Sequence, residues 1–176
     1  MSGKKRKEGF FIEPLKDSHD RAEFSCGIEE LDRYFKNQAG QDARRKVAAP
    51  FVLIDGATGI VAGFYTLSMR SVLLAELPAG VRKKLPRYPD VPVVLLGRMG
   101  VDVKYQRRGL GEALLFDALK RSYETRTEIA AIAVIVDAKH GAESFYLKYG
   151  FLRFSEQENR LFLPMKTIQA LLKNKV

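Results

Sequence analysis

Gln106-Arg107-Arg108-Gly109-Leu110-Gly111 is the stretch that decides the fold, because of the segments on either side of it. Residues 93–103, which precede it, have the apolar composition of a buried strand. The residues that follow carry apolar side chains at helical spacing, namely Leu110, Ala113, Leu114, Ala118 and Leu119. A strand, a glycine loop and a helix N-terminus together present outward-pointing backbone amides. The sequence therefore predicts an anion-binding site at this loop.

Other phosphate-binding motifs fit this stretch less well. A P-loop ends in Gly-Lys-Ser/Thr, and no such triplet follows. A dinucleotide fingerprint needs a third small residue, but Leu114 stands there, and its acidic partner would have to be Glu124 or Glu128, near the helix end. Two glycines can also form a simple turn before an ordinary helix, so the loop alone leaves that alternative open.

Length and composition indicate one globular domain inside the cell. The chain has 176 residues, of which 46% are hydrophobic, and no apolar run approaches the roughly eighteen residues of a membrane span. Cys26 is the only cysteine, so no intrachain disulfide forms and a reducing cytoplasm is expected. We expect a basic tail over residues 1–9 and one domain over residues 10–176. The two histidines and the cysteine show no metal-ligand spacing, so we expect no metal.

The order of predicted elements alternates between strands and helices. Strands are predicted at residues 10–12, 51–54, 60–67, 93–103 and 129–136, with a closing hairpin over 151–154 and 160–163. Helices are predicted from Ser25 or Gly27, with the apolar stripe Ile28, Leu31, Phe35 and Ala39, and then at residues 77–88, 110–119, 142–149 and from Thr167. The fold class is therefore α/β (α+β mixed), with one mixed, twisted sheet and helices on both faces.

The charge of the chain favours a polyanionic partner. Thirty Lys and Arg residues against twenty-one Asp and Glu give a net charge of +9, which attracts nucleic acid over long range. The basic residues cluster in three places, at Lys4–Lys7, at Arg33, Lys36, Arg44, Arg45 and Lys46, and at Arg82, Lys83, Lys84 and Arg87. A solvated charged face is the alternative for each of them.

Two motifs, in this order and spacing, resemble the GNAT acetyltransferase superfamily. Its acyl-CoA loop follows Gln/Arg-x-x-Gly-x-Gly/Ala, which Gln106, Gly109 and Gly111 match. Its last helix commonly ends in Phe-Tyr-x-x-x-Gly-Phe, which Phe145, Tyr146, Gly150 and Phe151 match. The resemblance covers nearly the whole chain and implies an N-acetyltransferase that uses acetyl-CoA.

Further segments are similar to the GNAT-type toxins of toxin–antitoxin systems. They are residues 27–35, 41–45, 97–102, 136–139 and 160–165. This resemblance implies acetylation of the α-amine of aminoacyl-tRNA, which blocks translation. It also implies a homodimer and inhibition by a small ribbon-helix-helix antitoxin.

The resemblance and the chemistry of acetyl-CoA together predict the donor site. Backbone amides of the loop would hold the diphosphate, and the edge of the strand at Met99–Val101 would pair with the pantetheine arm. Many relatives carry Asn where this chain has Lys139. Close relatives also usually have Leu-Ala where this chain has Met99-Gly100, and we expect the extra glycine, Gly100, to loosen the strand edge. The expected acetyl-CoA contacts are Met99, Gly100, Val101, Gln106, Arg107, Arg108, Gly109, Leu110, Gly111, Glu112 and Lys139.

Tyr146 is the predicted catalytic residue. Proton transfer from a phenol with a pKa near 10 to a thiolate whose thiol has a pKa near 8.5 is unfavourable by roughly 2 kcal/mol. This difference is small enough for a proton transfer that is concerted with departure of the thiolate. The alternative for Tyr146 is an aromatic core residue, but the neighbouring Phe145 is expected to fill that role because adjacent helix positions face different ways.

The acceptor is predicted from the lack of an evident general base. A lysine amine is neutral in only about one molecule per thousand at pH 7, whereas an α-amine is already roughly a tenth neutral. The sequence therefore favours an α-amine, as on charged tRNA. The residues predicted to contact tRNA phosphates are Arg33, Lys36, Arg44, Arg45 and Lys46, with Lys83, Lys84 and Arg87 extending the surface. Asp102, Glu143 and His140 remain candidate bases, and Cys26 is expected to be a small buried residue.

Two other classes of function stay open at this point. The chain could acetylate a small-molecule amine or a protein N-terminus, in which case the basic surface would be incidental. It could also be a non-catalytic acyl-CoA-binding module, although Tyr146 and the intact glycine loop argue against this.

Overall fold

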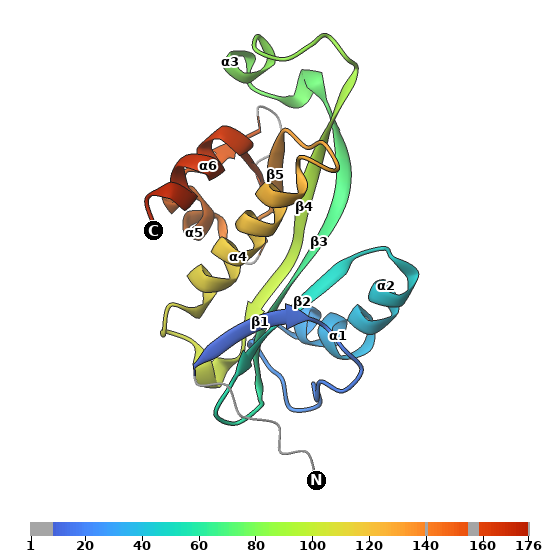
Figure 1. Cartoon of the computed structure of the whole chain (residues 1–176), viewed down its shortest axis with the longest axis vertical. Coiled ribbons are helices and arrows are strands. Elements are labelled where there is room, and N and C mark those ends of the chain that lie inside the picture. The colour runs from blue at the N-terminus through green and yellow to red at the C-terminus, as the bar shows by residue number, and fades with distance from the viewer. Residues whose placement is uncertain (1–8, 140, 155–158, 176) are drawn as a thin grey trace. The chain divides into compact units, whose positions relative to one another are not determined.

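The structure is a computed structural model that describes residues 9–139, 141–154 and 159–175. Within these residues, seven strands form one sheet in the order β1-β2-β3-β4-β5-β7-β6 (Figure 1). Strands β4 and β5 pair in parallel, whereas β1–β2, β2–β3, β5–β7 and β6–β7 pair antiparallel. The predicted mixed α/β sheet is therefore confirmed. The predicted basic tail, apart from Gly9, lies outside the described residues.

The strands are β1 (Phe10–Pro14), β2 (Ala49–Asp55), β3 (Val61–Leu73), β4 (Asp90–Val101), β5 (Ala133–Asp137), β6 (Leu152–Arg153) and β7 (Arg160–Pro164). The helices are α1 (Glu29–Asn37), α2 (Ala39–Arg45), α3 (Ala79–Arg82), α4 (Leu110–Thr125), α5 (Glu143–Lys148) and α6 (Met165–Lys173), with single 3-10 turns η1 (Leu74–Glu76) and η2 (Val103–Tyr105).

The chain divides into two compact units, which are described separately. The first contains the described residues up to Leu67 together with Arg98–Ala118. The second contains Ser68–Gly97 and the described residues from Leu119 onward. Strands β3 and β4 and helix α4 contribute residues to both units.

In the first unit, helices cover both faces of the sheet. Successive residues of a strand point to opposite faces, and Gly63 and Phe64 of β3 show this. A Cβ at Gly63 would touch Leu114 of α4 at 3.0 Å, whereas the Phe64 ring stacks on Phe35 of α1 with centroids 4.2 Å apart. Phe24 packs edge-on against both rings and completes this aromatic core.

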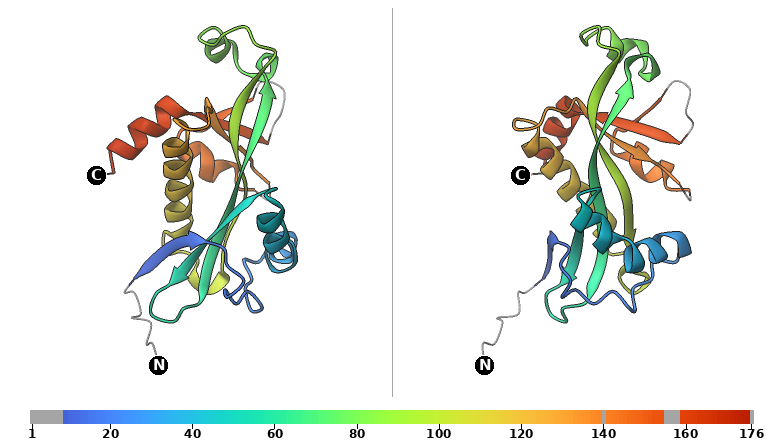
Figure 2. Two further views of the ribbon diagram at one scale, coloured as in Figure 1. Left: turned by 45° about the vertical axis from the view of Figure 1, so that its right-hand side comes forward. Right: turned by 90° about the vertical axis from the view of Figure 1, so that its right-hand side faces the viewer.

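The helix predicted from Ser25 or Gly27 starts later and is divided in two. The Asp32 carboxylate accepts hydrogen bonds from the Cys26 amide (2.8 Å) and the Ser25 hydroxyl (3.0 Å), which holds this segment outside the helix. Helix α1 therefore begins at Glu29, and Gln38, with φ −116°, separates it from α2. Figure 2 shows the two helices side by side, joined by a 2.9 Å hydrogen bond from Tyr34 to the buried Asp42.

Helix α4 follows the glycine loop as predicted, but its buried stripe differs at one position. Ala113 is exposed, and Leu115 is buried although it was not predicted to be. Burial of Leu115 makes the apolar stripe of α4 broader than predicted. The other four predicted residues, Leu110, Leu114, Ala118 and Leu119, are buried as expected.

In the second unit, the strand, the two helices and the closing hairpin that were predicted from residue 129 onward are present with shifted bounds. Strand β5 begins at Ala133, and Ile129, predicted to start it, is 55% exposed. Helix α5 ends before Gly150, whose φ of +91° suits a glycine cap. Helix α6 begins at Met165 rather than Thr167, directly after Pro164, the last residue of β7.

The predicted helix over residues 77–88 is wrong. Only Ala79–Arg82 is helical, because Gly80 and two prolines at 86 and 89 disfavour a longer helix. The segment is held instead by apolar contacts: Leu77 is buried, with Leu74, Val81 and Leu85 packed beside it. It forms the connection between β3 and β4 that carries α3 (Figures 1 and 2).

No helix within the described residues is long and apolar enough to cross a membrane.

Replacement of Gly63 by alanine should destabilise the first unit. The added Cβ would lie 3.0 Å from the Gly100 carbonyl oxygen, which is backbone and cannot move aside cheaply. We expect a loss of about 1–3 kcal/mol in the free energy of unfolding, measured by denaturant titration. Gly80→Ala is the control, because no heavy atom lies within 4 Å of its added Cβ. A Gly63→Ala protein as stable as the wild type would contradict this packing.

Candidate active site

The predicted glycine loop lies between the end of β4 and the start of α4. Arg107 and Gly109 both have left-handed backbones, with φ 63° and 73°. Such residues turn successive amides toward one side and create an anion-binding concavity. No heavy atom lies within 4 Å of the place of a Cβ on Gly109, so a ligand can approach the backbone there. Together with the N-terminus of α4, whose dipole favours negative charge, this loop fits the diphosphate of acetyl-CoA.

Two side chains fix this loop to the rest of the first unit. The Gln106 Nε2 group donates to the carbonyl oxygens of Val101 (2.9 Å) and Cys26 (3.0 Å). The Asp102 carboxylate is only 4% exposed and accepts from the amides of Ser25 (3.1 Å) and Lys104 (2.9 Å). Since Nε2 of Gln106 is used within the protein, its predicted contact with the cofactor would fall to its oxygen or its backbone.

The strand segment Met99–Val101 is half-buried and continuous with the rest of β4. The parallel ladder to β5 joins residues 94–96 to 134–136, and Met99–Val101 follow it along the strand. The strand runs through Gly100 without interruption. A Cβ at Gly100 would lie 3.3 Å from Cys26 and from Phe64, so glycine leaves room for these two buried side chains.

Cys26 is buried as predicted. Burial and the hydrogen bond with Asp32 raise the pKa of its thiol to about 11. The side chain is therefore a neutral packing group at neutral pH.

In the second unit, Tyr146 is the buried aromatic residue of α5. It is 7% exposed and packs edge-on against Phe151, with ring centroids 5.4 Å apart. Phe145, predicted to be the core residue, is only partly buried and leans on Tyr149 instead. The buried face of α5 therefore contains Tyr146 rather than Phe145, because Tyr146 is the residue that packs against Phe151.

The Tyr146 hydroxyl has no hydrogen-bond partner among the described residues. Burial raises the pKa of this phenol above its ordinary value. The group therefore stays protonated at neutral pH, and its hydroxyl is not used as a donor within the described part of the chain.

The other predicted residues near α5 have different surroundings. Lys139 is exposed and is the last residue of its described segment, and His140 lies outside the described residues. Glu143 forms an ion pair with Arg153, whose Nη2 lies 2.7 Å from Oε1. Its carboxylate is therefore already paired with a cation.

All eight basic residues predicted to contact RNA are exposed. In the first unit, two of them have carboxylate partners: Arg33 with Glu29 (2.7 Å) and Arg44 with Asp17 (3.3 Å). Exposed pairs of this kind contribute little and exchange readily with a phosphate. Lys36, Arg45 and Lys46 are exposed on α1 and at the end of α2. In the second unit, Lys83, Lys84 and Arg87 follow α3.

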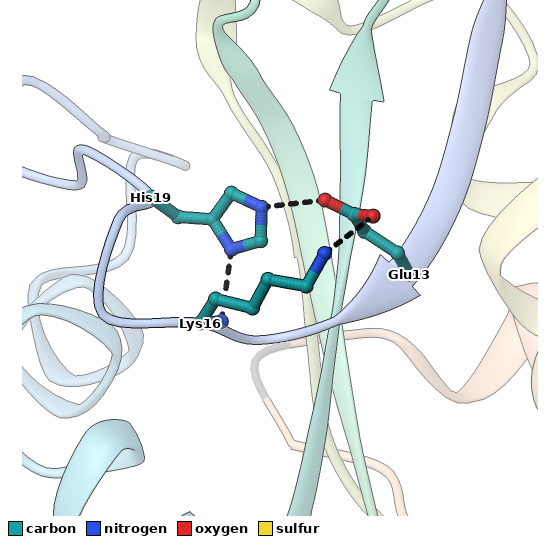
Figure 3. Close-up of polar contacts among 3 residues, drawn as sticks. All are labelled: Glu13, Lys16 and His19. Atoms are coloured by element: carbon teal, nitrogen blue, oxygen red, sulfur yellow. Dashed lines mark hydrogen bonds and ion pairs between the residues drawn. The ribbon is translucent and has the colours of Figure 1, made fainter.

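A polar cluster after β1 was not predicted from the sequence. His19 Nδ1 accepts from the Lys16 amide (3.0 Å), which leaves Nε2 to donate to Glu13 (2.8 Å), as Figure 3 shows. The hydrogen bonds from Lys16 and His19 lower the pKa of Glu13. The cluster shapes a loop that lines a pocket of about 560 Å³ together with Lys36 and Asn37. The hydrogen bonds of this cluster join residues that lie only 3 or 6 positions apart. No sequence motif identifies a turn held by a histidine and a glutamate, so the cluster could not be predicted.

Among the described residues, no group of three or more His, Cys, Asp or Glu side chains is arranged to hold a metal ion.

Comparison with known proteins identifies the family. The family model described as an acetyltransferase (GNAT) domain matches residues 92–168, which include the glycine loop and Tyr146. The probable toxin TacT of Sinorhizobium fredii is 30% identical over 170 residues, which cover 92% of this chain and 94% of its own. The tRNA-acetylating toxin of Mycobacterium tuberculosis is 36% identical over 159 residues, which cover 90% and 93%.

Solved structures give the same result. A KacT variant with tyrosine replaced by phenylalanine superposes with a TM-score of 0.87 at 29% identity, covering 93% of this chain and 99% of that one. AtaT complexed with acetyl-methionyl-tRNAfMet superposes with a TM-score of 0.85 at 30% sequence identity, with the same coverage of both chains. A mutant AtaT bound to acetyl-CoA and the C-terminus of the antitoxin AtaR gives 0.79 at 26%, covering 94% and 99%. With relatives this similar over almost its whole length, the chain belongs to the GNAT acetyltransferase family.

Proposed function

We propose that this protein transfers the acetyl group of acetyl-CoA to the α-amine of aminoacyl-tRNA and thereby blocks translation. The observation that carries the proposal is the 36% identity, over 90% of the chain, to a tRNA-acetylating toxin. The structural neighbour AtaT, complexed with acetyl-methionyl-tRNAfMet, supports the same acceptor. The geometry of the loop and the state of Tyr146 supply the chemistry.

The acyl donor is held by backbone more than by side chains. We assign the diphosphate to the amides of Arg107–Gly111 and Glu112, in the left-handed loop and the first turn of α4. The pantetheine amides pair with the backbone of Met99–Val101 as an added strand. Lys139, exposed just before α5, supplies a cation for a phosphate group of the donor.

Tyr146 supplies the proton that the leaving group needs. The α-amine attacks the thioester carbonyl carbon, a C–N bond forms, and the C–S bond breaks. The departing thiolate takes the proton of the Tyr146 hydroxyl, and the amine releases its own proton to solvent. The hydroxyl suits this role because burial keeps it protonated and no described residue uses it as a donor.

The state of the carboxylates favours an acceptor that needs no strong base. Asp102 is buried with both oxygens bound to backbone amides, and Glu143 is paired with Arg153. An α-amine is already roughly a tenth neutral at pH 7, whereas a lysine side chain is about a hundredfold less so. An aminoacyl ester therefore suits this site better than a lysine does.

The exposed basic residues form the RNA-binding surface in this proposal. Arg33, Lys36, Arg44, Arg45 and Lys46 contact tRNA phosphates from the first unit, and Lys83, Lys84 and Arg87 do so from the second. The net charge of +9 draws the polyanion in.

The proposal extends to partners and compartment. Because AtaT is seen with its antitoxin AtaR, we propose that a small antitoxin of ribbon-helix-helix type inhibits this protein. We also propose a homodimer that acts in the cytoplasm, where charged tRNA and acetyl-CoA are available.

Removal of the Tyr146 hydroxyl should abolish transfer without disturbing the fold. Tyr146→Phe keeps the ring packed on Phe151, so we expect kcat to fall by about 100-fold or more, while calorimetric acetyl-CoA affinity stays unchanged. Tyr149→Phe, which removes a hydroxyl just beyond the same helix, should keep nearly full activity. A Tyr146→Phe enzyme with wild-type kcat would contradict the assignment.

The pH dependence should show one rising limb. The initial rate should increase up to about pH 8, as the α-amine loses its proton, and then level off. No falling limb is expected below pH 10, because the pKa of Tyr146 is raised and the phenol keeps its proton there. Short incubations with charged tRNA at each pH measure this. A decline between pH 8 and 9.5, with substrate still charged, would argue against a Tyr146 acid.

Charge reversal on α2 should weaken tRNA binding alone. Arg44→Glu/Arg45→Glu should raise the KM for charged tRNA by about tenfold or more at physiological salt and leave acetyl-CoA affinity unchanged. Lys166→Glu/Lys173→Glu on α6 changes the net charge equally at exposed positions and should have a much smaller effect. Equal effects of the two double variants would show that only net charge matters.

A further inference from the structure

Tyr88 is an exposed aromatic residue in the connection between α3 and β4. Its side chain is 65% exposed, more than the other large apolar residues of the described chain. Among the described residues it forms no side-chain hydrogen bond and no ring contact. The phenol ring therefore offers its faces to solvent.

The exposure of Tyr88 does not come from a loosely packed segment. The apolar residues around it turn inward: Leu77 is buried, and Leu74, Val81 and Leu85 pack against the same cluster. Backbone hydrogen bonds fix both sides of the tyrosine, from the Tyr88 amide to Pro86 (2.9 Å) and from the Leu74 amide to Pro89 (3.0 Å). With prolines at 86 and 89, the ring is presented on a stiff support. This arrangement lowers the entropy lost when a ligand stacks on it.

The charge around Tyr88 indicates what kind of ligand it meets. Four cations lie close to it in the chain, namely Arg82, Lys83, Lys84 and Arg87, and no carboxylate occurs between Glu76 and Asp90. All four are exposed. A positively charged surface that carries an aromatic ring is the arrangement that binds unpaired nucleotides, because the cations meet phosphates and the ring stacks on a base. The observations favour RNA over a protein or lipid partner, because a ring on a rigid support beside cations suits stacking on a base next to phosphates.

We propose that Tyr88 stacks on an unpaired base at the 3′ end of the tRNA and positions that end for acetylation. This inference rests on the proposed function and adds a positioning residue to it. Bases within the acceptor stem are paired and stacked on both faces, and side chains do not enter the narrow major groove of an RNA helix. The unpaired 3′ nucleotides, which carry the aminoacyl group, have free faces. The cations that follow α3 hold the adjoining phosphates.

A single tryptophan tests the contact directly, because the chain contains none. Tyr88→Trp places an indole at the proposed stacking position, and Leu73→Trp places one at another exposed apolar position of the same unit (55% exposed). The probes are an RNA hairpin with a single-stranded 3′ tail and the same hairpin with a blunt end. We expect the tailed hairpin to quench Tyr88→Trp fluorescence, and we expect little quenching from the blunt hairpin or in Leu73→Trp. Equal quenching by both hairpins, or none from a tailed hairpin that binds, would overturn the inference.

Steady-state kinetics give an independent test. Tyr88→Ala should raise the KM for charged tRNA by about 5- to 100-fold, as expected for the loss of one stacked base, with the KM for acetyl-CoA unchanged. Tyr88→Phe keeps the ring and should behave as the wild type. The salt dependence of tRNA binding should stay the same in Tyr88→Ala but fall in Lys83→Gln/Lys84→Gln, because stacking releases no counterions.

The failures of the two proposals are distinguishable. Wild-type protein that does not acetylate charged tRNA would overturn the proposed function, whatever the variants do. Wild-type protein that acetylates it, beside a Tyr88→Ala protein with the same KM, would overturn only the role of Tyr88.

Discussion

The two hydrogen bonds from Gln106 and the buried carboxylate of Asp102 are the interactions on which the geometry of the glycine loop depends. In the proposed function the loop amides bind the diphosphate, so other groups have to stabilise the loop. Gln106 instead ties the loop to Val101 and Cys26, while Asp102 satisfies the amides of Ser25 and Lys104. The left-handed backbones of Arg107 and Gly109 are maintained within this frame. The site is therefore preorganised for an anion before any ligand arrives.

The second unit contributes groups of a different kind. Tyr146 carries a buried, neutral hydroxyl, which we propose as the proton donor, and its ring packs edge-on against Phe151. The connection around Tyr88 is exposed and basic, as the proposed contact with RNA requires. Neither feature needs a metal or a strong general base. This division suits an acetyltransferase whose acceptor is a large polyanion with an amine that is already partly neutral at physiological pH.

Much of this could be predicted from local sequence patterns. The glycine loop, the alternation of strands and helices, and the cap at Gly150 follow from spacing and backbone preference over short windows. The contacts that stabilise the loop could not be predicted, because Asp102 bonds Ser25 and Gln106 bonds Cys26 across 77 and 80 residues. The rotation of α5, which buries Tyr146 rather than Phe145, depends on where Phe151 lies in space. A short helix has too few turns to fix its buried face by periodicity.

The connection from Leu77 to Tyr88 shows a second limit of sequence reasoning. Its apolar residues occur at intervals that predict a helix, but they serve to fold a loop around prolines. Only when the inward positions are known does Tyr88 stand out as the one large apolar side chain of this connection that the packing leaves exposed.

The most direct measurement of the central claim is the identity of the product. Purified protein would be incubated with acetyl-CoA and charged total tRNA, and the 3′-terminal aminoacyl-adenosines released by RNase would be analysed by mass spectrometry. The account predicts adenosines that carry an N-acetylated amino acid, in amounts that grow with time and depend on acetyl-CoA. Unmodified aminoacyl-adenosines, with protein that binds acetyl-CoA and acetylates some other amine, would contradict it.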